Sequence, residues 1–127
     1  MYKFDFDILE RQILKQYRAL NSRVWSVNDY FIVIKYFIIA YKKNTGREHK
    51  HLSNDNLLDI MCKLPYADNE YSSGYKCGYV DFFPDDYING GMIDKYFKTK
   101  FKSGCDYSIY HFLSDGVRAI KYYECCY

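Results

Sequence analysis

Apolar side chains recur every three or four residues through most of this chain, which is the spacing of one face of an α-helix. Asp7, followed three residues later by Glu10, is typical of a helix start, because such side chains satisfy free backbone N–H groups. The pattern predicts a first helix over residues 7–21. The apolar residues with this spacing are Leu9, Ile13, Tyr17, Leu20 and Val24.

A second apolar run covers residues 30–41 and contains Lys35 as its only charged residue. Ser26 is a suitable N-cap for it, and Gly46 can adopt the left-handed conformation that closes a helix. The apolar stretch is too short for a membrane span, which needs about 20 residues. We expect a buried central helix. The β-branched and aromatic residues leave a buried strand open as the alternative for residues 30–39.

A third helix is predicted between Ser53 and Pro65, since serine caps a helix start and proline cannot continue a helix interior. Serine and glycine residues interrupt the helical spacing over residues 66–84, which predicts an irregular or small β insert. Helical spacing then resumes in two further runs, the second of which begins after Asp106. Whether residues 117–124 form helix or strand is left open.

Together these patterns predict a mainly α fold: a single compact domain, residues 1–127, of four or five helices around this insert. A hydrophobic content of 49% with 27% charged residues is typical of globular proteins. The chain also contains 16 tyrosines and 9 phenylalanines. Because tyrosine combines a large ring with a hydroxyl, we expect many of these rings to lie half-buried, and more of them than a core of this size can hide.

The formal charge of +2 is unevenly distributed along the chain. The basic side chains gather in two segments, residues 42–51 and 95–102. Phosphates bind such groups, and Tyr41 beside the first segment is placed to stack with a base. A nucleic-acid-binding accessory protein is therefore the alternative function. Its candidate residues are Lys42, Lys43, Arg47, His49, Lys50, His51, Lys98, Lys100 and Lys102.

No catalytic or cofactor motif stands out. The Gly90–Gly91 pair lacks the lysine and the preceding strand of a phosphate-binding loop. The five cysteines show neither a disulfide framework nor the paired spacing of a metal site. His111 lies near Asp106 and Asp115 in the sequence, but no nucleophile or substrate pocket can be assigned to it. We therefore predict a non-enzymatic protein without catalytic residues, metal or cofactor.

Protein–protein recognition has the strongest support, because interfaces are enriched in tyrosine. In the middle segment tyrosine recurs every four residues beside a block of acidic side chains. The candidate partner-binding residues are Tyr71, Tyr75, Tyr79, Asp81, Asp85 and Asp86. The alternative for Asp85 and Asp86 is that one of them caps a helix beginning after Pro84.

In type, the chain resembles the small stand-alone inhibitors and accessory factors of phages and mobile elements, including anti-CRISPR proteins, although it matches no family motif. Its richness in Phe, Tyr, Ile, Asn and Lys is typical of AT-rich genomes. We expect a phage- or mobile-element-encoded stoichiometric inhibitor or adaptor, for example of a host nuclease defence. The expected partner is a host or phage protein, and the expected location is cytoplasmic, because the first residues lack a signal-peptide layout.

Overall fold

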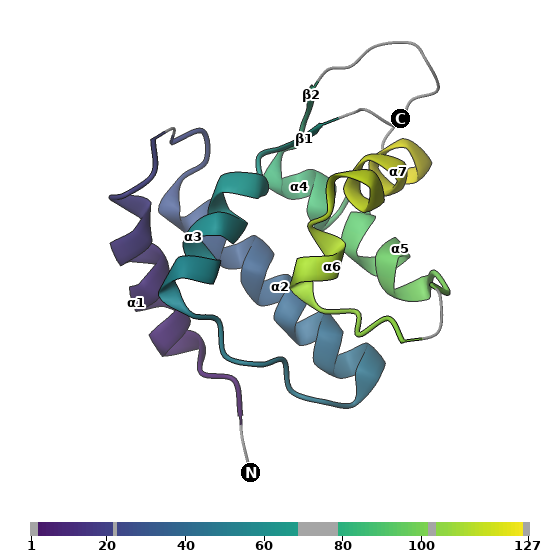
Figure 1. Ribbon diagram of the computed structural model, residues 1–127, viewed down its shortest axis with the longest axis horizontal. Helices are drawn as coiled ribbons and strands as arrows, with labels where there is room; N and C mark the ends of the chain where they lie inside the picture. Colours follow the sequence, from purple (N-terminus) through teal and green to yellow (C-terminus); the bar gives the residue numbers. More distant parts are fainter. Residues whose placement is uncertain (1–2, 22, 69–78, 102–103, 126–127) are drawn as a thin grey trace.

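Helix α2 (Val27–Thr45) runs through the middle of the fold, and α1, α4 and α5 pack against it (Figure 1). The computed structural model describes residues 3–21, 23–68, 79–101 and 104–125. In chain order its elements are α1 (Phe6–Tyr17), α2, α3 (Asn54–Lys63), β1 (Tyr66–Asp68), β2 (Tyr79–Asp81), α4 (Pro84–Tyr87), α5 (Met92–Lys98), α6 (Ile109–Phe112) and α7 (Asp115–Cys125). The predicted mainly helical, compact fold is confirmed.

The ends of α2 follow from two local signals. Ser26 and Asp29 form a capping box: Ser26 Oγ accepts from the Asp29 N–H at 3.1 Å, and Asp29 Oδ2 accepts from the Ser26 N–H at 3.3 Å. At the other end Gly46 adopts φ +74°, a conformation that costs glycine little. The strand alternative for residues 30–39 is wrong, because these residues lie inside α2.

Helix α1 is shorter than predicted and begins one residue earlier. Its N-cap is Asp5, whose carboxylate accepts from the backbone N–H groups of Asp7 and Ile8 at 2.9 and 3.1 Å. The helix ends at Tyr17, so Leu20 and Val24 lie beyond it. Leu20 is still buried, whereas Val24 is exposed.

The helical pattern after Asp106 forms two helices, α6 and α7, separated by Leu113 and Ser114. Gly116 lies inside α7, one residue after the helix begins. Residues 117–124 are helical, so the strand alternative for them is wrong.

The middle insert contains a two-stranded antiparallel ladder, which confirms the predicted small β insert. Tyr66 pairs with Asp81, and Asp68 pairs with Tyr79. No helix within the described ranges is long and apolar enough to cross a membrane.

Aromatic rings fill the core between the helices. Phe37 of α2, Tyr96 of α5 and Phe112 of α6 are buried and pack together, with ring centroids 5.0 to 6.0 Å apart. Many other rings are half-buried, as expected. Among the described tyrosine and phenylalanine side chains, only Tyr66, Phe83 and Tyr110 are exposed. The expected large surplus of rings at the surface is therefore not found in this part of the chain.

A buried arginine ties α7 to the end of α3 and to β1. Arg118 is 0% exposed, and its Nη1 donates to the carbonyl oxygens of Lys63 and Tyr66, the latter at 3.0 Å. The same nitrogen lies 3.4 Å from the hydroxyl of Tyr87, which donates to the carbonyl of Leu64. Carbonyl groups at the end of α3 that would otherwise be buried without partners are satisfied in this way.

Candidate protein-binding groove

The predicted partner-binding residues fall around the two-stranded insert. Tyr71 and Tyr75 lie outside the described residues. The backbone of Tyr79 begins β2 opposite Asp68, and Asp81 ends the same strand with an exposed side chain. The predicted binding surface formed by Tyr71, Tyr75 and Tyr79 therefore stays a prediction.

Asp85 and Asp86 both have partners at helix α4. Asp86 Oδ2 accepts from the backbone N–H of Phe83 at 2.8 Å, and Asp85 Oδ1 accepts from the side-chain amide of Asn89 at 2.6 Å. The Asp86 contact matches the alternative interpretation, in which one of the two carboxylates stabilises a helix start. Phe83, which is 71% exposed, is the prominent apolar side chain beside them.

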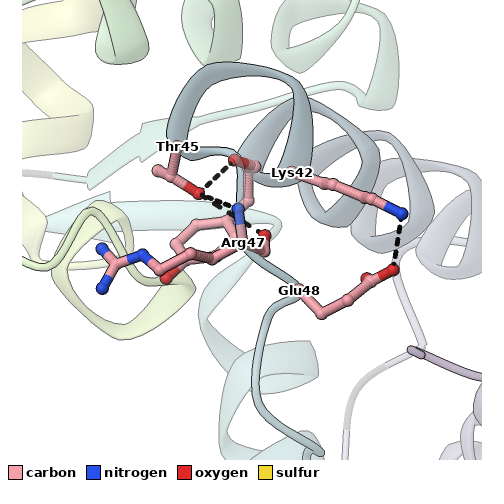
Figure 2. A network of polar contacts seen from close by, with 5 residues as sticks. Lys42, Thr45, Arg47 and Glu48 are labelled. Atoms are coloured by element: carbon pink, nitrogen blue, oxygen red, sulfur yellow. Dashed lines mark hydrogen bonds and ion pairs between the residues drawn. The ribbon is translucent and has the colours of Figure 1, made fainter. Parts of the chain in front are cut away.

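The first basic segment begins in the last turn of α2, and the side chains of Lys42 and Arg47 point in different directions (Figure 2). Lys42 Nζ lies 2.8 Å from a carboxylate oxygen of Glu48, and this contact lowers the pKa of Glu48. Thr45 Oγ1 donates to the carbonyl of Tyr41 at 2.7 Å and accepts from the backbone N–H of Arg47 at 3.2 Å. The Arg47 side chain extends away from the Lys42–Glu48 pair, so the two cations serve different surfaces (Figure 2).

His49 does not lie on an exposed nucleic-acid-binding surface as predicted, because it is buried, with 2% of its surface exposed. Its Nε2 lies 3.1 Å from the backbone nitrogen of Ile109, and its Nδ1 lies 2.9 Å from the carbonyl oxygen of Lys50. Since the N–H of Ile109 can only donate, Nε2 accepts and Nδ1 carries the proton. Burial lowers the pKa of His49, which favours this neutral form. The ring therefore supports the fold by joining the segment after α2 to Ile109.

The other predicted basic residues are spread over several elements. Lys102 lies outside the described residues. The exposed members of the whole predicted set are Lys42, Lys43, Arg47, Lys50, His51, Lys98 and Lys100. Two of them, Lys43 of α2 and Lys98 of α5, line one shared hollow.

The outer face of α2 retains exposed apolar side chains. Ile32 is 37% exposed and Ile39 is 50% exposed, and a separation of seven residues places them on the same face of the helix. Lys43 continues this face one turn further along. Hollows of the surface lie on both sides of Ile39 and Lys43, which line both of them. We call Ile39, Lys43 and the two hollows that they line the α2 groove.

The more apolar hollow has a volume of about 430 Å³ and lies between α2 and the segment that leads into α1. Phe4, Phe6 and Ile38 supply its apolar wall. Its charged lining residues are Lys3, Lys42, Lys43 and Glu48.

The second hollow has a volume of about 320 Å³ and lies between α2 and α5. The Tyr36 hydroxyl bridges the two helices, because it lies 2.9 Å from both carboxylate oxygens of Asp94. Burial and this hydrogen bond raise the pKa of Tyr36, so the phenol keeps its proton and donates. The two helices that form the walls are thus joined directly.

The lining of the α2 groove carries an excess of cations. Lys42 is paired with Glu48, and Asp94 accepts from Tyr36. Within the described residues Lys3, Lys43 and Lys98 form no ion pair. An apolar surface bordered by unpaired lysines complements a ligand that combines apolar and acidic groups.

Sequence reasoning missed most of the α2 groove. The seven-residue spacing of Ile32 and Ile39 was visible, but a run of apolar residues with one lysine indicates a helix buried on all sides. Phe6 and Asp94, which come from distant segments, gave no local signal. Only the tertiary arrangement brings them beside α2.

A third hollow, of about 260 Å³, lies on another side of the end of α2. Arg47 and Lys50 line it together with Tyr110, which is 44% exposed, and with Asp106. The part of the chain that can be described holds no group of three or more His, Cys, Asp or Glu side chains arranged to bind a metal ion.

No family model, curated protein or solved structure matches this chain. What it does must therefore be argued from the geometry of its surface.

Proposed function

We propose that this chain is a small non-enzymatic protein-binding module whose α2 groove receives an apolar, acidic segment of a partner protein. Ile39 is the observation that carries this proposal. It is half-exposed between two hollows on a helix that is otherwise central to the core. Covering such apolar surface is favourable by about 25 cal/mol per Å², so a partner side chain that fills the hollows gains free energy.

Charge decides which segment fits best. Lys3, Lys43 and Lys98 line the groove without ion-pair partners among the described residues, and a basic segment would be repelled by them. A segment with a large apolar side chain flanked by aspartate or glutamate fills the hollow and meets the lysines. Amphipathic helices bind hydrophobic grooves in this way.

The biological role that fits such a module is that of a stoichiometric inhibitor or adaptor. A module that binds an acidic, apolar segment of another protein blocks that segment and needs no catalytic step. The AT-rich composition agrees with a phage or mobile-element origin, for which a host nuclease defence is one suitable target.

Selection from a displayed library of short peptides tests the binding proposal and does not require the partner to be identified first. We expect peptides that bind the wild-type protein to be enriched in Leu or Phe together with Asp or Glu. Ile39→Asp should weaken their binding by about tenfold or more, since tenfold corresponds to about 1.4 kcal/mol. Leu14→Asp is the matched control, because Leu14 is 48% exposed on α1 and lines neither hollow.

Selected peptides without an acidic preference, or peptides that bind Ile39→Asp as tightly as Leu14→Asp, would remove the α2 groove as the binding site. Circular dichroism and thermal unfolding of both variants establish that each remains folded.

Nucleic-acid binding is the second candidate, and the third hollow favours it. Arg47 and Lys50 can neutralise phosphates, while the exposed ring of Tyr110 can stack with a base. Fluorescence anisotropy with labelled single-stranded DNA and RNA at low salt tests this candidate. Binding that weakens with added salt and is lost in Arg47→Gln and Tyr110→Ala supports it, whereas absent or salt-insensitive binding rejects it.

A further inference from the structure

Two side chains from the C-terminal half of the chain, Tyr96 and Cys105, converge on one ring nitrogen of His111. The Tyr96 hydroxyl lies 2.8 Å from His111 Nδ1, and Cys105 Sγ lies 3.5 Å from the same atom. Burial raises the pKa of Tyr96, and its contact with Cys105 raises the pKa further, so the phenol remains protonated. A nucleophile, a base and a hydrogen-bond donor thus occupy one small site.

Aromatic side chains hold the histidine ring at the edge of the core. Tyr96 is 0% exposed, and the ring centroid of Phe101 lies 4.8 Å from that of His111. Cys105 and His111 are only half-buried. Each of these two residues therefore keeps part of its surface open to solvent.

A carboxylate adds negative charge beside this pair. The backbone N–H of Ser108 donates to Asp106 Oδ1 at 3.0 Å, which is the main cause of the lowered pKa of Asp106. The charge of His111 lowers that pKa as well. An imidazolium formed at His111 is thus attracted by an ionised Asp106.

We infer that Cys105 is a modification site for small uncharged electrophiles, with hydroperoxides as the oxidising class and His111 as the base. In the resting site the Tyr96 hydroxyl donates to His111 Nδ1. As the hydroxyl turns its hydrogen to the sulfur, the thiol proton passes to Nδ1, and the new N–H donates to the Tyr96 oxygen. The thiolate attacks one peroxide oxygen, so the S–O bond forms as the O–O bond breaks. The leaving alkoxide takes the proton from His111. The products are a sulfenic acid at Cys105 and an alcohol, with the sulfur oxidised and the peroxide reduced.

Two other cysteines provide comparisons within the same molecule. Cys62 is exposed and Cys125 is half-buried, and neither has a hydrogen bond to a histidine in the described part of the chain. Burial raises the pKa of both thiols, which disfavours their reactive thiolate forms. Exposure alone would make Cys62 the most reactive of the three.

Timed alkylation of the folded protein by iodoacetamide at neutral pH, read by peptide mass spectrometry, measures each thiol separately. We expect Cys105 to react faster than Cys62 and Cys125. In His111→Gln the rate at Cys105 should fall by about tenfold or more, since loss of a general base costs at least this much. The rates at Cys62 and Cys125 should not change, which shows that the variant remains folded. Hydrogen peroxide followed by dimedone should label Cys105 first.

The inference is overturned if Cys105 reacts no faster than Cys62, or if His111→Gln leaves the rate at Cys105 unchanged. Tyr96→Phe supplies a second variant that retains the ring but removes the hydroxyl. It should slow alkylation of Cys105 less than His111→Gln does, because the donor only assists the step.

Discussion

Nε2 of His49 accepts a hydrogen bond from the backbone N–H of Ile109 at 3.1 Å. This contact joins the segment after α2 to the first residue of α6. The His49 ring also packs against Tyr41, with ring centroids 4.8 Å apart, and against Phe37. A neutral histidine therefore links two distant parts of the chain inside the core.

We predict that the free energy of unfolding falls as the pH drops below about 6.5, the ordinary pKa of histidine. Burial lowers the pKa of His49 in the folded protein, so the unfolded chain binds a proton that the folded protein excludes. Stability is complete above the unfolded pKa and is lost as the pH falls from there toward the folded pKa. Urea unfolding from about pH 8 to about pH 5 measures this loss.

His49→Gln separates this effect from the titration of other groups. The amide can replace one hydrogen bond, but it does not titrate. The variant should be less stable than the wild type near neutral pH, and its stability should change less between neutral and mildly acidic pH. An equal pH dependence in both proteins would contradict the role assigned to His49.

Arg118→Met should strongly destabilise the protein. The substitution keeps an apolar stem but leaves the carbonyls of Lys63 and Tyr66 without this donor. Breaking a buried charged network costs about 3 to 5 kcal/mol, which chemical denaturation can measure. Arg11→Met on the exposed face of α1 is the control and should change stability by less than about 0.5 kcal/mol. A loss below about 1 kcal/mol for Arg118→Met would contradict the account.

Ser26→Ala tests the start of the central helix. The substitution removes the side-chain acceptor for the Asp29 N–H and should cost about 1 kcal/mol. Asn28→Ala, a position in the same turn, should cost much less. Equal thermal unfolding of the two variants would show that the capping box does not stabilise α2.

Tyr36→Phe should loosen the wall between α2 and α5. It removes the hydroxyl that donates to Asp94, and the expected loss of stability is about 0.5 to 1.5 kcal/mol. Binding of selected acidic peptides should weaken at the same time, because the groove is less fixed. Unchanged stability and unchanged affinity together would show that this bridge is unimportant.

Local signals in the sequence explain most of the helices. Ser26, Gly46 and Pro65 act on their nearest neighbours, so the boundaries of α2 and α3 could be predicted closely. The start of α1 was misplaced because Asp5 and Asp7 are both suitable caps, and the sequence does not distinguish them.

The functional surface could not be predicted in the same way. His49 belongs to a basic segment, yet the fold buries it against Ile109, which lies 60 residues away. Asp94 and Tyr36 meet only when α5 packs on α2. Such pairings depend on tertiary structure, whereas sequence spacing reports only one element at a time.

A charge swap tests the α2 groove most directly. Lys43→Glu should weaken the binding of an acidic peptide selected on the wild-type protein by about tenfold or more, and Lys15→Glu on α1 should leave it unchanged. Replacing the acidic residues of the peptide by lysine should abolish binding to the wild type, and this basic peptide should bind Lys43→Glu more tightly than it binds the wild type. If Lys43→Glu binds the acidic peptide normally, or if the basic peptide gains nothing from the substitution, the α2 groove is not the binding site.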